Sequence, residues 1–98
     1  MLVLAPAVAR CTSRIAIPAT RFKQSAYHIA HVALISDDDI RNAQRKLWRD
    51  MQLVTEPGGA AAFAALLSGA YRPAADERVG VVVCGANTSM DVFGQLFS

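Results

Sequence analysis

The length, composition and charge of the chain exclude several classes of protein. Ninety-eight residues fit one small domain with few strands, and a content of 53% hydrophobic and 18% charged residues is too apolar for a disordered tail and too interrupted by charge for a membrane span. The net charge of +2 is not clustered with aromatic residues, so the sequence predicts no nucleic-acid surface.

The first 30 residues differ in character from the rest. Residues 1–36 carry four Arg or Lys residues and no acid, whereas all eight acids lie from Asp37 onward. Such a start fits a mitochondrial transit peptide, or a fragment whose natural N-terminus lies elsewhere. Residues 1–30 therefore stay unassigned, with disorder as one interpretation. Cys11 and Cys84 lack CxxC spacing, which predicts neither a zinc site nor a disulfide and makes the cytoplasm the default compartment.

The next residues predict a strand end or connection followed by an amphipathic helix. Residues 32–35 form a short β-branched apolar run, and Ser36 is a good N-cap for a helix over about 39–51. Three acids at 37–39 suit the positive end of that helix. Apolar residues recur with helical spacing at Ile40, Ala43, Leu47 and Met51, which leaves four basic side chains mostly on the outer face, namely Arg41, Arg45, Lys46 and Arg49.

A second helix, a strand and a third helix follow. Pro57 suits the first turn of a helix whose alanine-rich stretch, residues 60–67, allows close packing, and Ser68-Gly69 is a plausible stop. Residues 80–84 form a continuous apolar run, which is typical of a strand buried on both faces of a parallel sheet. Residues 90–97 predict a short apolar helix. This order favours an α/β unit.

Four segments resemble the C-terminal part of serine/threonine dehydratases, which are fold type II pyridoxal-phosphate (PLP) enzymes. The segments are Ile35-Ser-Asp-Asp-Asp-Ile40, Leu47-Trp48, Glu56-Pro-Gly-Gly-Ala-Ala61 and Val81-Val-Val-Cys-Gly-Ala-Asn87, in this order and with matching spacing. The resemblance covers roughly residues 30–97. It implies a tryptophan-synthase-β-like fold of class α/β, with residues 31–98 as the C-terminal part of the cofactor-binding domain.

The resemblance also implies which residues contact the cofactor. Cys84 stands where the family carries a Ser or Cys facing the pyridine nitrogen of PLP, and a protonated thiol there would donate a weak hydrogen bond without protonating the ring. The alternative for Cys84 is a small buried core residue. Gly85 would let backbone approach the ligand. Glu56 would face the cofactor or orient the loop, or alternatively act on the dipole of the helix. Asn87 matches the motif's Asn, as a loop-bonding residue.

Two family features are not found in the sequence, namely the cofactor-binding lysine in its motif and a glycine-rich phosphate loop. Lys46 falls on a polar helix face, and Lys23 lacks the flanking residues of the lysine motif. His28 and His31 have no third ligand at metal-binding spacing, so no metal site is predicted.

We therefore expect a C-terminal fragment of a PLP-dependent serine/threonine dehydratase that is inactive alone. The resemblance implies an amino-acid substrate, deaminated to a 2-oxo acid and ammonia, and a partner that supplies the missing N-terminal part. The alternative is a non-catalytic α/β interaction module or a homo-oligomer built through exposed apolar faces.

Overall fold

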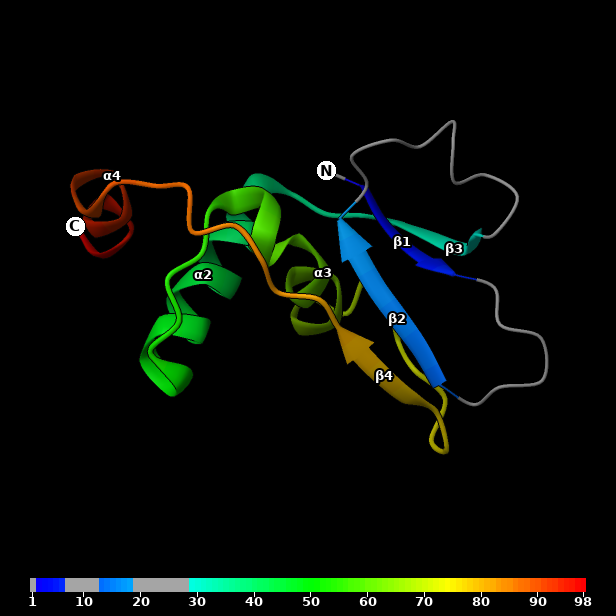
Figure 1. The fold of residues 1–98 in the computed structure, drawn as a ribbon. Helices are drawn as coiled ribbons and strands as arrows, with labels where there is room; N and C mark the ends of the chain where they lie inside the picture. The colour runs from blue at the N-terminus through cyan, green and yellow to red at the C-terminus, as the bar shows by residue number, and fades with distance from the viewer. Residues whose placement is uncertain (1, 7–12, 19–28) are drawn as a thin grey trace.

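The computed structural model describes residues 2–6, 13–18 and 29–98, with side chains from residue 33 onward. Its elements, in chain order, are β1 (Leu2–Pro6), β2 (Ser13–Pro18), β3 (Ile29–Leu34), α2 (Asp37–Met51), α3 (Pro57–Leu67), β4 (Arg78–Val81), α4 (Met90–Gly94) and the 3-10 turn η2 (Gln95–Phe97). Figure 1 shows the strands at one end of the molecule and the C-terminus at the other, with α3 and α2 between them. The predicted order of helices and strand after residue 36 is confirmed.

The four described strands form one mixed sheet in the order β3-β1-β2-β4. β1 is antiparallel to both β2 and β3, and β4 runs parallel to β2 with Ser13 opposite Arg78. The expectation that residues 80–84 form a strand buried on both faces is wrong. β4 ends at Val81 and lies at the edge of the described sheet, its residues alternate between exposed and half-buried, and Val82 is 40% exposed.

Helix α2 begins with a capping box. The amide of Asp39 donates to Oγ of Ser36 at 3.1 Å, and the amide of Ser36 donates to Oδ2 of Asp39 at 3.2 Å, so two free donors of the first turn are satisfied reciprocally. Of the three acids at the helix start, Asp39 thus makes the capping contact, whereas Oδ1 of Asp38 accepts from Nη1 of Arg41 at 2.7 Å on the surface. Ile40, Ala43 and Leu47 are buried, which confirms the apolar stripe, whereas Met51 at its end is exposed.

Helix α3 forms the centre of the core. Its first residue is Pro57, and the helix ends with Ser68 at the C-cap followed by Gly69 at φ 81°, as predicted. Five alanines of α3 are at most 1% exposed, and the helix packs against α2 and against β1 and β2. Side chains this small let the layers approach closely, as the alanine-rich sequence indicated. In the described part of the chain, each helix is too short or too polar to traverse a bilayer.

The C-terminal segment, residues 90–98, covers part of the outer face of α2. Phe93 is 6% exposed and lies edge-on to the rings of Trp48 and Phe97, at centroid distances of 5.9 and 5.7 Å. Nε of Arg45 donates to the carbonyl oxygen of Leu96 at 2.6 Å. Arg45 thus lies on the outer face of the helix, as expected, but it is half-buried there because the C-terminal segment docks on this face.

Candidate functional site

Three of the four sequence-predicted site residues meet where the loop after β4 passes the N-terminus of α3. The amide of Glu56 donates to the carbonyl oxygen of Gly85 at 2.5 Å, and the amide of Cys84 donates to the carbonyl oxygen of Gly59 at 3.3 Å. These two backbone bonds join segments that are more than 20 residues apart in the sequence. We call Glu56, Gly59, Cys84 and Gly85 the Cys84 corner.

The corner depends on two glycines. A Cβ added at Gly59 would overlap the carbonyl group of Cys84, so the backbone of α3 touches the backbone of the loop directly. Gly85 has φ 77°, in the left-handed region, and a Cβ there would overlap the carboxylate of Glu56. The role of Gly59 was not predicted. A signal was present, since two successive glycines in the first turn of an otherwise alanine-rich helix are costly unless a neighbour requires them.

The side chains of the corner are accessible. Cys84 is exposed, three residues beyond the carboxyl end of β4, so the alternative of a buried core cysteine is wrong. Glu56 is half-buried and occupies the N-cap of α3 without a side-chain cap bond, and its carboxylate lies beside Gly85 instead. Asn87 is exposed further along the loop, and no hydrogen bond joins it to the corner.

Lys46, the one lysine among the described residues, does not reach the corner. Nζ of Lys46 pairs with Oδ2 of Asp50 at 2.7 Å on the surface of α2, with about half of each side chain exposed, which confirms that Lys46 is a solvated residue. Lys23, His28 and Cys11 lie outside the described residues, and the side chain of His31 does too.

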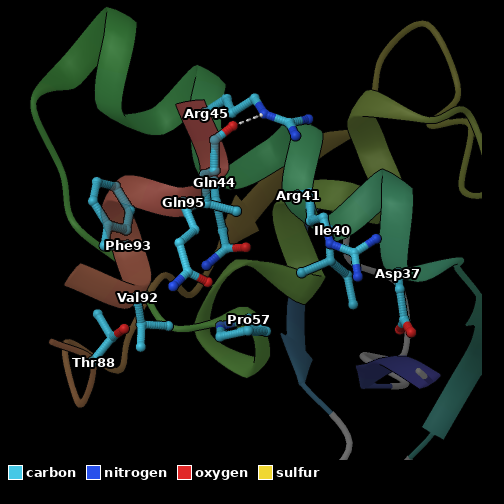
Figure 2. Close-up of a pocket in the computed structure, with 11 residues that line it drawn as sticks. Asp37, Ile40, Arg41, Gln44, Arg45, Pro57, Thr88, Val92, Phe93 and Gln95 are labelled. Carbon is cyan, nitrogen blue, oxygen red and sulfur yellow. Dashed lines mark hydrogen bonds between the residues drawn. The ribbon is translucent and has the colours of Figure 1, made fainter. Parts of the chain in front are cut away.

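A cavity of about 490 Å³ lies next to the corner, between α2, the start of α3 and the C-terminal segment. Figure 2 shows its lining, with Gln44 extending from α2 toward Pro57 and the bond from Arg45 to the C-terminal turn drawn as a dashed line. Pro57 and Thr88 line this cavity, but Cys84 and Gly85 do not. The cavity and the corner are therefore neighbouring, distinct features.

The chemistry available at the corner is limited and specific. It offers a thiol as a neutral weak donor, a carboxylate as an acceptor and a backbone turn with no side chain at Gly85. Among the described residues no amine accompanies these groups, because the one described lysine lies elsewhere. Such a set can orient a bound ring and tune its charge, but the described part of the corner does not supply the amine that a Schiff base requires.

Comparison with known proteins identifies what the sequence of this chain resembles. The chain is 40% identical over 68 residues to a phenylserine dehydratase of Ralstonia pickettii, covering 69% of this chain and 21% of that protein. It is 33% identical over 64 residues to a beta-hydroxyaspartate dehydratase of Paracoccus denitrificans, covering 65% of this chain and 20% of that protein. A serine racemase of Dictyostelium discoideum is 26% identical over 68 residues, with 68% of this chain and 21% of that protein covered.

The chain thus spans about one fifth of the length of these curated relatives. No solved structure matches it significantly. The family model of pyridoxal-phosphate dependent enzymes matches residues 6–85. That match begins within residues 1–30, to which the sequence alone assigned no domain. The domain boundary at residue 30 stays a prediction. Because the model covers most of the chain, this protein belongs to the pyridoxal-phosphate dependent enzyme family, with its tryptophan-synthase-β-like fold and PLP as its cofactor.

Proposed function

We propose that this chain supplies the cofactor-ring side of a PLP-dependent dehydratase that acts on β-hydroxy-α-amino acids, serine or threonine among them. The observation that carries the proposal is the Cys84 corner, where two segments distant in sequence bring an exposed thiol and a carboxylate together around a glycine turn. The family and the dehydratase names of two relatives support the reaction type.

The residues at the corner fit the ring of PLP. Cys84 and Gly85 would lie against the ring, Cys84 as a neutral donor toward its nitrogen, and Glu56 would hold the turn beside it. Asn87 would bond within the loop further along. Bound PLP supplies the electron sink that lets the α-proton of the substrate leave. A donor that leaves the ring nitrogen unprotonated limits that sink, which favours loss of the β-hydroxyl over transamination. On this proposal, the chain binds the ring of PLP and limits how strongly the ring withdraws electrons.

The proposed reaction removes the α-proton and the β-hydroxyl of the amino acid as water. Hydrolysis of the unsaturated amine product then gives a 2-oxo acid and ammonia. The three relatives are named for phenylserine, β-hydroxyaspartate and serine, which share a hydroxyl on Cβ. The proposed substrate class is therefore defined by its leaving group, the β-hydroxyl. The preference between serine and threonine is determined by residues outside the Cys84 corner.

Activity requires further protein, on this proposal. The remaining four fifths of a family enzyme would bring the cofactor-binding lysine and the phosphate loop, so the partner of this chain is the rest of the enzyme. We place the enzyme in the cytoplasm, where a free thiol such as Cys84 stays reduced.

Co-expression tests this function. The chain is produced together with the polypeptide encoded upstream of it, and the purified complex is assayed with PLP for 2-oxo acid formation from L-serine and L-threonine. Cys84→Ser keeps a neutral donor and should retain activity, whereas Cys84→Ala should lose about fivefold for one neutral hydrogen bond. A PLP-loaded complex that forms no 2-oxo acid from these two substrates, nor from phenylserine or β-hydroxyaspartate, would show the dehydratase assignment to be wrong.

The alternative, a non-catalytic interaction module or homo-oligomer, is favoured by exposed apolar side chains at Leu34, Met51 and Met90, each at least 63% exposed. Borohydride reduction of the chain with PLP, followed by mass spectrometry, separates the candidates further. We expect no stoichiometric lysine adduct on the isolated chain. A specific adduct at Lys23 would mean that this chain carries its own cofactor lysine.

A further inference from the structure

Gln44 is a buried polar residue on the apolar face of α2. It falls between Ala43 and Leu47 on the stripe that packs against α3, and it is 3% exposed. Its Nε2 donates to the backbone carbonyl oxygen of Thr55 at 2.8 Å, in a bond between buried groups 11 residues apart. Since apolar side chains fill the neighbouring positions, the amide at this position calls for a specific partner.

The partner lies one residue from the Cys84 corner. Thr55, itself 2% exposed, is followed by Glu56, whose amide donates to the carbonyl oxygen of Gly85. A continuous path of hydrogen bonds and one peptide unit therefore runs from the side chain of Gln44 through Thr55 and Glu56 to Gly85. The path fixes the backbone of the corner relative to the middle of α2.

Only the donor of Gln44 is engaged in this path. Oε1 of Gln44 and Oγ1 of Thr55 are buried without a hydrogen-bond partner. Leaving polar atoms unpaired in the interior is unfavourable, and an apolar side chain of equal length would fill the same space without that cost. The feature that an apolar residue does not provide is the Nε2 donor aimed at the Thr55 carbonyl.

We propose that Gln44 is a positioning residue for the Cys84 corner, which it holds at a fixed place relative to α2 through the backbone of Thr55 and Glu56. Its relevance to cofactor binding rests on the function proposed above, whereas the mechanical link does not. Loss of the donor loosens the bonds at Glu56 and Cys84 and leaves the hydrogen bonds of distant helical turns unchanged.

Amide hydrogen exchange on the full chain without cofactor tests this link. In Gln44→Met, the amides of Glu56 and Cys84 should exchange about five- to tenfold faster, the size expected for one lost buried hydrogen bond. The reference amides are Ser68, bonded to Ala64, and Phe93, bonded to Ser89, and their rates should not change. Gln44→Asn is the second variant, because one methylene fewer withdraws the donor while keeping an amide, and it should accelerate the same two sites.

Thr55→Val is the matched control. It removes the unpaired Oγ1 but keeps the carbonyl that accepts from Gln44, so it should leave Glu56 and Cys84 exchange as in the parent. Equal acceleration of all amides, or no acceleration at Glu56 and Cys84, overturns the proposal by showing a general packing role or none. A Thr55→Val effect equal to that of Gln44→Met overturns it by assigning the link to the hydroxyl. None of these measurements involves PLP, so their outcome does not depend on whether the dehydratase assignment is correct.

Discussion

The Cys84 corner and the C-terminal segment are both long-range contacts, but they are built in opposite ways. At the corner, backbone meets backbone, and the contact exists because Gly59 and Gly85 carry no side chain. The C-terminal segment is instead held on α2 by side chains, through the rings of Phe93 and Trp48 and the guanidinium of Arg45. The first contact should therefore be intolerant of added atoms, and the second sensitive to removed ones.

The largest effect is expected for Gly59→Ala. The new methyl group would overlap the backbone of Cys84, which has no flexible end to move aside, so we expect a loss of more than about 3 kcal/mol in the free energy of unfolding measured with urea. Gly58→Ala is the matched control. It lies in the same turn with nothing within 4 Å of the new atom, and should stabilise the chain by about 0.5 kcal/mol. Similar effects of both substitutions would contradict the direct backbone contact.

Phe93→Ala should break the C-terminal contact and lower stability by about 3 kcal/mol, at the small end for a buried phenylalanine. Trp48 is the chain's single tryptophan and its ring contacts Phe93, so tryptophan emission reports on the side chain next to this contact. We expect a red shift as water reaches the indole. Val92→Ala, at a side chain 58% exposed, should leave the emission unchanged, and an unshifted spectrum in Phe93→Ala would argue against the docking.

Gly85→Ala should cost about 1–2 kcal/mol, because an alanine at φ 77° is strained. The effect is smaller than at Gly59 since the overlapping group is the end of the Glu56 side chain, which can move. Urea unfolding measures it. The matched control is Gly94→Ala, where nothing lies within 4 Å and no loss is expected; equal losses at both glycines would count against strain at the turn.

Arg45→Met should have the smallest effect of the four, about 1 kcal/mol. It removes the part-buried hydrogen bond to Leu96 and an exposed one to Asn42, but keeps the aliphatic packing. Lys46→Met is the neighbouring control. It breaks the surface pair with Asp50, which is worth only about 0.3 kcal/mol. Thermal unfolding of the two variants side by side distinguishes them, and identical midpoints would mean that Arg45 does not fasten the segment.

The local parts of this fold could be predicted from the sequence. The cap at Ser36, the start of α3 at Pro57 and its end at Ser68-Gly69 depend on residues within one or two turns. The sheet was predictable only in part. The continuous apolar run at residues 80–84 indicated a parallel neighbour, and β4 does run parallel to β2. The edge position of β4 and the antiparallel strands of the sheet were not indicated by the sequence, because they depend on pairing with residues 1–18, for which no strands were predicted.

The candidate site was predictable in part for the same reason. Motif spacing indicated Glu56, Cys84 and Gly85, and the structure brings them together, whereas Asn87 lies apart from them. Gln44 was missed although its polar side chain interrupts an apolar helix face, a pattern readable without a structure. The contact of Arg45 with Leu96 could not be predicted from the sequence, because its acceptor is a backbone carbonyl oxygen 51 residues away.

The alanine surface of α3 has a mechanical consequence. Alanine has no side-chain torsion to readjust, so a helix sheathed in alanine cannot absorb a displacement by switching rotamers. A displacement of α2 against α3 must therefore be taken up by the larger facing side chains of α2, such as Ile40 and Leu47, or by movement of α3 as a whole. The alanine face of α3 thus leaves the adjustment of this interface to the other helix.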